Sequence, residues 1–394
     1  MKLKVFFALL LIYTFTTTCS NKVSIQSSET LDLAINLRWI PSYEEETHQK
    51  IEVGLKWVLS YLGATLPQAS TDDAFSWTQT NILQLDLSKA GFSDRTNVVW
   101  NQLIREYKKT SEYQQYGSLD IGKFVLLSFN SSWHYYAITD APTTFNEFKS
   151  NYAFANKHSA QFLPDRSGVT SGIRIVHTSH AESALQIAHF AEEGTGTTIE
   201  EFQNKEIEAF DIMPNGQPRF VIYDENGLLK AGASKEISRA GKPAKCMWCH
   251  ESGIQLPFRV INQFPDELHQ FQSFNNTVTL QNKMLDNYYK SFLPQQDTFR
   301  NKKELHYLAE LLYITYQSPT IMRAEGELRF LKKYDKIDDL SITQEKHHEF
   351  KFLKNLVRRS NLDSLTQINT YHHISSRETH PMEINLISQS ENIE

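Results

Sequence analysis

The chain is poor in cysteine. Its 394 residues include only three, Cys19, Cys246 and Cys249. So few cysteines exclude the dense disulfide framework that stabilises many small secreted domains. Cys246 and Cys249 are separated by two residues, and Cys19 lies far from both in the sequence, so none is left over for a network of structural disulfides. The three cysteines are therefore candidates for a functional role, such as attachment of a lipid or a cofactor.

Several motifs of common enzyme and nucleotide-binding classes are also missing. The run Gly194, Thr195 and Gly196 lacks the further glycine and the lysine of the nucleotide-binding loops. No G-x-S-x-G or H-E-x-x-H sequence occurs. The formal net charge of −6 gives no support to nucleic-acid binding, which usually requires a basic face. We expect no nucleic-acid partner.

The one long apolar run lies at the start of the chain, from Val5 to Phe15. It follows Lys2 and Lys4 and precedes a stretch of small residues, a pattern typical of a signal peptide. At about 11 residues it is too short for a membrane-spanning helix, which needs about 20. We expect residues 1–19 to be a signal peptide and the mature chain to lie outside the cytoplasm.

Cys19 at the end of this leader resembles the lipobox cysteine of bacterial lipoproteins. The resemblance implies that Cys19 is lipidated and anchors the mature chain to a bacterial membrane, on its periplasmic or cell-surface side. The polar residues 20–30 would then form a tether. Thr16 stands where a lipobox favours leucine, so cleavage without lipidation is the alternative.

The run Cys246, Met247, Trp248, Cys249 and His250 has the form C-x-x-C-H. Two thiols at this spacing can add across the two vinyl groups of one haem, and the histidine that follows can bind its iron. The motif resembles that of c-type cytochromes. The resemblance implies one haem c, with thioether bonds to Cys246 and Cys249 and with His250 as the proximal ligand.

The second axial ligand of such a haem is not fixed by the motif. Met322 follows Ser318 and Pro319 in a plausible loop-to-helix position, and a methionine ligand raises the reduction potential. Met284, His269 and His306 are the alternatives. An open sixth position would mean ligand binding or peroxide chemistry instead of simple electron transfer.

Three other interpretations of the cysteine pair stay open. Cys246 and Cys249 could be a redox-active dithiol, a simple disulfide, or part of a structural zinc site, although zinc needs four ligands. A separate metal cluster of His177, His180 and His189 is not favoured, because His177 and His180 on one strand would point to opposite faces.

Hydrophobic periodicity predicts an α+β fold. We expect a mixed α/β domain over residues 31–235 that contains a β-meander, a mainly α-helical haem-bearing region over residues 236–360, and a polar tail from 361 to 394. Asp94 is a candidate helix N-cap. Residues 124–129 fit a strand or a buried helix equally well. The expected strands are 31–39, 81–87, 133–138, 172–178 and the meander 206–212, 219–223 and 228–231; the expected helices are 44–62, 94–109, 145–154, 277–292, 300–316, 321–334 and 342–359.

These patterns together predict an extracytoplasmic, lipid-anchored monohaem c-type cytochrome that transfers single electrons to a redox partner protein of unknown identity. One alternative is a ligand- or partner-binding surface lipoprotein with a Cys246–Cys249 disulfide. Another is a haem enzyme of the peroxidase or oxidase type with an open iron site. Haem staining of the denatured protein distinguishes the disulfide lipoprotein from the other two.

Overall fold

The computed structural model describes residues 31–39, 47–65, 73–155, 160–162, 174–196, 200–234, 236–238, 241–250, 254, 267–292 and 312. The expected signal peptide, tether and polar tail lie outside these residues, as do the helices expected at 321–334 and 342–359 and all of 300–316 except Leu312. Within the described residues no helix is both long and apolar enough to cross a membrane.

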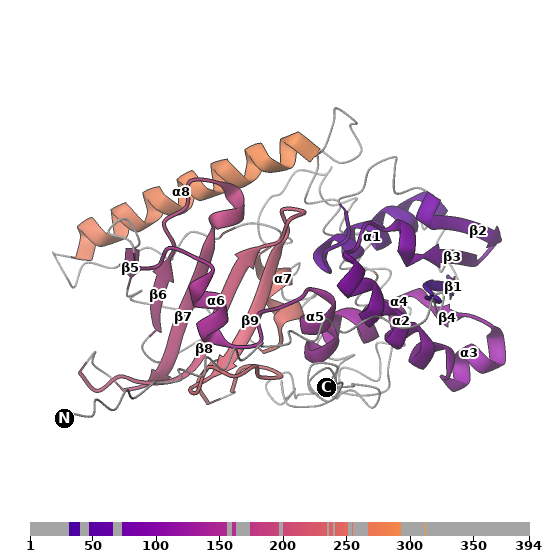
Figure 1. Cartoon of the computed structure of the whole chain (residues 1–394), viewed down its shortest axis with the longest axis horizontal. Coiled ribbons are helices and arrows are strands. Elements are labelled where there is room, and N and C mark those ends of the chain that lie inside the picture. The colour runs from indigo at the N-terminus through magenta and orange to yellow at the C-terminus, as the bar shows by residue number, and fades with distance from the viewer. Residues whose placement is uncertain are drawn as a thin grey trace, which may run out of the picture. The chain divides into compact units, whose positions relative to one another are not determined.

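The described part of the chain has a mixed α+β fold with two sheets (Figure 1). The first sheet has the order β2-β3-β1-β4 and is antiparallel except for the β1–β4 pair. The second is a five-stranded antiparallel meander in sequence order, β5 to β9. The strands are β1 (Ala34–Arg38), β2 (Phe75–Gln79), β3 (Ile82–Asp86), β4 (Leu119–Asp120), β5 (Ala160–Phe162), β6 (Arg174–Thr178), β7 (Ala188–Thr195), β8 (Gln203–Ile212) and β9 (Pro218–Asp224).

The helices follow local signals that the sequence carries. Helix α1 buries Ile51, Leu55 and Val58 at helical spacing, and the Thr47 side chain caps it by accepting from the Lys50 amide. The helices are α1 (His48–Tyr61), α2 (Asp94–Lys108), α3 (Ser111–Tyr116), α4 (Ile121–Val125), α5 (Ser132–Ile138), α6 (Phe145–Ser150), α7 (Pro243–His250) and α8 (Glu267–Phe292), with the short turns η2 (Leu87–Lys89), η3 (Leu126–Asn130, π-helical) and η4 (Ala184–Gln186).

Two local predictions about helices were wrong. The N-cap of α2 is Ser93, whose side chain accepts from the Thr96 amide, and Asp94 lies in the first turn, where its charge favours the helix dipole. Residues 133–138 form helix α5 instead of a strand. The Ser131 hydroxyl caps this helix, and burial of Tyr135 and Tyr136 outweighs the β-propensity of these side chains.

The meander also differs from its prediction. Residues 228–231 make only isolated bridges, from Leu228 to Thr144 and from Leu229 to Tyr223. Backbone hydrogen bonds still link this segment to β9, from the Asp224 amide to the Leu228 carbonyl and from the Lys230 amide to the Ile222 carbonyl. The Lys230 side chain and the Ser234 amide bind the Glu206 carboxylate. Strand β7, which the sequence did not predict, pairs with β8 on the side away from β9.

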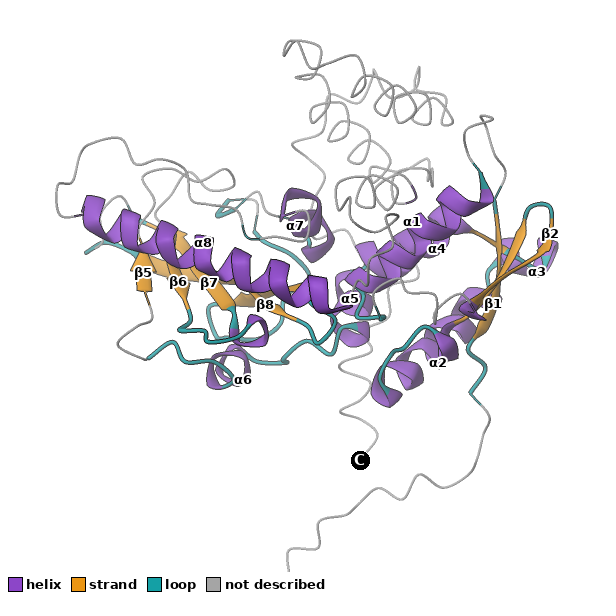
Figure 2. Cartoon of the chain, turned by 90° about the horizontal axis from the view of Figure 1, so that it is seen from above, coloured by secondary structure: helices purple, strands orange, loops and turns teal. Residues whose placement is uncertain are grey.

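Helices α7 and α8 cover one face of the second sheet. Helix α7 packs against β9, α5 and η3, and α8 lies across the strands from β5 to β7 (Figure 2). The opposite face carries Phe190 and Tyr223, which contact Phe145 of α6. Buried side chains of α7 and α8 belong to the same core cluster as those of both sheets.

The β8–β9 turn joins α1 and α8 to the sheet. The Asn215 amide nitrogen donates to the Ser60 carbonyl at 2.7 Å and to the Ala64 carbonyl at 2.6 Å, at the end of α1. From α8, the Tyr289 hydroxyl donates to the Gly216 carbonyl at 2.8 Å. Gly216 has a φ of +87°, and a Cβ there would lie 3.2 Å from the Tyr288 ring, so the turn requires glycine.

Replacing Asn215 by Ala should destabilise the protein by about 2–3 kcal/mol, because two buried carbonyl groups lose their donor. Urea unfolding measures the change. The matched control is Asn226→Ala in the exposed Asp224–Gly227 turn, which should cost less than about 0.5 kcal/mol. Equal losses in the two variants would show that the Asn215 side chain does not link α1 to the turn.

Candidate functional site

The C-x-x-C-H sequence lies within α7, an eight-residue helix that begins at Pro243 and ends at His250. Proline is suited to a first helical position, because its missing amide would have no helical acceptor there. Positions 246, 249 and 250 are three and four residues apart, so they share one face of the helix. Cys246 and His250 are both half-buried.

Met247 explains how α7 is attached to the rest of the fold. Its side chain is fully buried and belongs to the core cluster. In a helix its side chain projects about 100° away from that of Cys246, which is partly buried and packs against the edge of the same core cluster. A bulky residue inside the motif therefore has a structural role here.

The His250 ring packs against aromatic residues of the sheet. Its centroid lies 5.6 Å from that of Phe210 on β8 and 5.1 Å from that of Phe220 on β9. Phe210 and Phe220 are cross-strand partners, and the same row continues to His189 on β7 and Thr178 on β6. We call these four residues the His189 row; they share one face of the sheet.

His189 is a buried member of this row that the sequence did not place near the motif. Its ring stacks on Phe210 with centroids 4.8 Å apart, and its Nε2 lies 2.8 Å from Oε1 of Gln281 on α8. Burial lowers the pKa of His189 to about 4, and the nearby His250 adds a smaller effect in the same direction. The imidazole is therefore neutral at pH 7, which is the form that binds metals.

The structure does not bring His177 and His189 together. His177 pairs across the strands with Phe190 and lies 3.1 Å from the Glu192 carboxylate, whereas His189 pairs with Thr178. The two imidazoles therefore lie on opposite faces of the sheet. His180 makes its own contact with Glu182, at 3.7 Å.

Two tyrosines of α5 lie beside the motif helix. The Tyr135 hydroxyl accepts from the Phe220 amide at 3.0 Å, and the Tyr136 hydroxyl donates to the Lys230 carbonyl at 2.8 Å. Burial raises the pKa of both hydroxyls, and the charge of the Cys246 thiolate would raise them further. Two cysteine positions and an imidazole on one helical face, bordered by aromatic rings, suit a flat apolar macrocycle such as haem.

The remaining candidate residues from the sequence lie either on helix α8 or outside the described residues. Met284 on α8 is partly buried and packs against the core cluster. The backbone of His269 lies in the first turn of α8. Cys19, His306 and Met322 lie outside the described residues.

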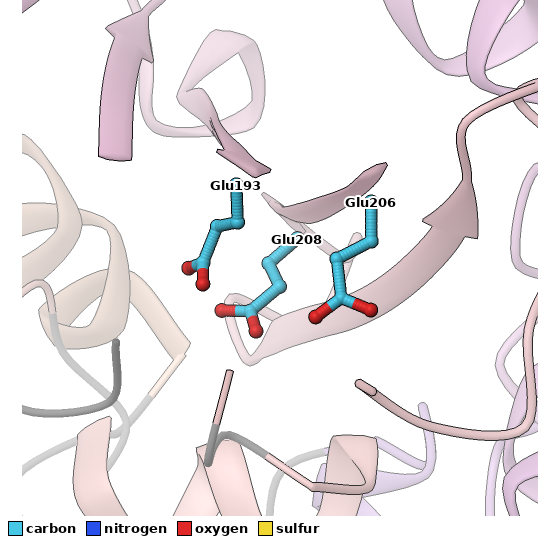
Figure 3. Close-up of side chains that lie close together, drawn as sticks. All are labelled: Glu193, Glu206 and Glu208. Carbon is cyan, nitrogen blue, oxygen red and sulfur yellow. The ribbon is translucent and has the colours of Figure 1, made fainter. Parts of the chain in front are cut away.

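A second polar group lies on the same sheet face as the His189 row. Glu193 of β7 and Glu206 of β8 are cross-strand partners, and Glu208 lies on β8 between Glu206 and Phe210 (Figure 3). One oxygen from each carboxylate lies within 4.8 Å of the others. We call these three residues the carboxylate cluster. The sequence did not reveal it, because alternating glutamates in a strand usually face solvent.

Basic side chains border the carboxylate cluster. Nη1 of Arg174 lies 2.5 Å from Glu193 and 3.5 Å from Glu208, and Nζ of Lys230 lies 2.6 Å from Glu206. Burial, followed by the charge of Glu208, raises the pKa of Glu193 to about 9. Burial also raises the pKa of Glu206. Glu193 therefore carries a proton at pH 7 when no other cation neutralises the cluster.

The chain has no match among protein-family models, curated proteins or solved structures.

The raised pKa of Glu193 predicts how stability depends on pH. In the unfolded chain this carboxyl loses its proton near the ordinary pKa of 4.5, whereas the folded protein keeps the proton up to about pH 9. Between these values the folded state binds more protons, so raising the pH costs stability. Glu193→Gln mimics the protonated group and should remove this loss.

The measurement is the free energy of unfolding of both proteins from about pH 5 to about pH 9. We expect the stability advantage of Glu193→Gln over the native protein to grow with pH. Glu192→Gln is the matched control on the same strand and opposite face. A pH profile of Glu193→Gln parallel to that of the native protein would mean that Glu193 is already ionised in the folded state.

Proposed function

We propose that the chain is a c-type cytochrome with a single haem, and specifically a membrane-anchored extracytoplasmic lipoprotein that transfers single electrons. The observation that supports this best is the C-x-x-C-H sequence on one helical face, with His250 against the aromatic residues of the His189 row. In this proposal, residues 236–360 form a mainly helical haem-bearing region.

Each residue of the motif has a separate task in this proposal. Cys246 and Cys249 form the thioether bonds, and His250 is the proximal ligand. Haem bound in this way accepts and donates one electron at a time. Met247 fixes α7 to the core, and the rings of Phe210 and Phe220 exclude water on the side of His250, which favours the less charged state of the iron centre.

The anchor and the electron partner are further parts of the proposal. Lipidation of Cys19 would attach the mature chain to a bacterial membrane, and residues 20–30 would separate it from the lipid surface. The electron donor and acceptor are redox proteins of unknown identity that meet the chain on the periplasmic or cell-surface side.

The first test is a pyridine haemochrome spectrum and an intact mass of the full chain matured in a host that attaches c-type haem. We expect the α band of a haem with two thioether bonds and a mass increase of one haem. The Cys246→Ala and Cys249→Ala double variant should lose both signals. The Cys19→Ser variant should keep the haem but no longer be found in the membrane fraction.

Other outcomes point to other functions. A native chain without haem, with a mass two hydrogens below that of the dithiol, would establish the disulfide lipoprotein and end the cytochrome proposal. Haem with a high-spin iron that binds added ligands would indicate the haem enzyme with an open iron site instead of an electron carrier.

The proximal assignment has its own test in the absorption spectrum. His250→Ala should abolish the native Soret band while covalent attachment through the cysteines continues, because the iron loses its imidazole ligand. His177→Ala, a half-buried histidine on the opposite face of the sheet, should leave the band unchanged. A native Soret band in His250→Ala would exclude His250 as the ligand.

Met322 is the proposed second axial ligand, and Met284, His269 and His306 are the alternatives from the sequence. The geometry adds His189, because its imidazole is neutral and contacts Phe210 beside His250. In the spectra of the variants Met322→Ala and His189→Ala, only the variant that lacks the true ligand should change to a high-spin form.

A further inference from the structure

The carboxylate cluster is built by the register of two strands. Glu193 and Glu206 are directly opposite each other, and Glu208 follows Glu206 by two residues on the same face. Figure 3 shows the three carboxylate groups side by side, each reached from its own backbone position. The side chains of Glu193 and Glu206 are both 0% exposed, and that of Glu208 is 11% exposed. The group is therefore largely removed from water.

Three carboxylate oxygens of the cluster are buried without a hydrogen-bond donor among the described residues. They are both oxygens of Glu193 and Oε1 of Glu206. Arg174 forms an ion pair with Oε1 of Glu193 at 2.5 Å but does not donate to it with hydrogen-bond geometry. A buried acceptor without a donor is costly, so the oxygens of Glu193 and Oε1 of Glu206 leave a place for a shared proton or a cation in addition to Arg174.

The neighbouring donors are committed to other oxygens. Nζ of Lys230 and the Ser234 amide both donate to Oε2 of Glu206, at 2.6 and 2.7 Å, and leave Oε1 directed at the cluster. The Ser238 hydroxyl donates to Oε1 of Glu208 at 2.6 Å. These contacts orient Glu206 and Glu208 without satisfying the remaining oxygens.

Charge alone does not decide between a proton and a metal ion. Three carboxylates with Arg174 and Lys230 sum to one net negative charge (−3 + 2 = −1) when all are ionised. A proton on Glu193 would cancel that charge, but it can bond only one further oxygen and would leave Oε1 of Glu206 unsatisfied. A divalent cation would leave a net charge of +1 (−1 + 2 = +1), but it could contact an oxygen of each carboxylate at once.

We propose that Glu193, Glu206 and Glu208 bind one hard divalent cation of the Ca²⁺, Mg²⁺ or Mn²⁺ class. The donor set consists of oxygen alone, which such ions prefer, and it contains no sulfur or nitrogen that would favour zinc or copper. The site is independent of the haem proposal, since none of its residues belongs to the motif or to the His189 row.

The test is isothermal titration calorimetry of the full chain, stripped with EDTA and dialysed, against Mn²⁺ and separately against Ca²⁺. We expect one cation per chain for at least one of the two ions. Glu206→Gln should weaken binding by about tenfold or more, because it removes one of three anionic ligands. Glu192→Gln is the matched control on β7, directed to the opposite face, and should bind like the native chain.

The outcomes separate the possible occupants. No binding of either ion by a native chain that circular dichroism shows to be folded would overturn the proposal and leave a proton as the occupant. Equal weakening in Glu192→Gln and Glu206→Gln would also overturn it, because the ion would then bind surface charge in general. If Glu206→Gln does not fold, Glu208→Gln takes its place, since Ser238 can donate to an amide oxygen and the ion pair of Glu208 with Arg174 is long, at 3.5 Å.

Discussion

The register of β8 between β7 and β9 determines what the rest of the second sheet can present. In this register Glu206, Glu208 and Phe210 alternate onto one face, and Ile207 and Ala209 onto the other. A slip of one residue would exchange the two sets and place the carboxylates against the phenylalanines of the opposite layer. The position of α7 over Phe210 and Phe220 is therefore a consequence of strand pairing.

Two kinds of contact then fix the helices on this face. Met247 packs α7 into the core, and α8 combines buried apolar side chains with polar contacts from Gln281 to His189 and from Tyr289 to Gly216. Apolar packing tolerates small displacements, and hydrogen bonds with defined geometry do not.

The sequence predicted the elements whose signals are local. The helix at α1, the strands at β1 and β3, and both turns that flank β9 follow from periodicity, caps and glycine positions. It did not predict α5, because Tyr135 and Tyr136 have high β-propensity and become helical through contacts with residues more than eighty positions away. Strand β7 was missed because its two buried faces give no clean alternation.

The residues of the candidate site also divide into those that local sequence signals reveal and those that depend on contacts between distant segments. Cys246, Cys249 and His250 are visible as a motif because they lie within five consecutive residues of the sequence. His189 and the carboxylate cluster depend on pairings between strands, which no single segment encodes. In the sequence, the glutamates at positions 206 and 208 resemble the solvent-exposed side of a strand. The structure shows that Lys230 contacts Glu206 and that Ser238 contacts Glu208.

The contact between Asn215 and Ser60 joins residues 155 positions apart in the chain. Closing so large a loop is slow compared with forming a helix or a hairpin, so the order of events during maturation matters. The hairpin of β8 and β9 can therefore form before its turn is joined to α1. Cys246, which is half-buried in the folded protein, stays more accessible until α7 packs against β9.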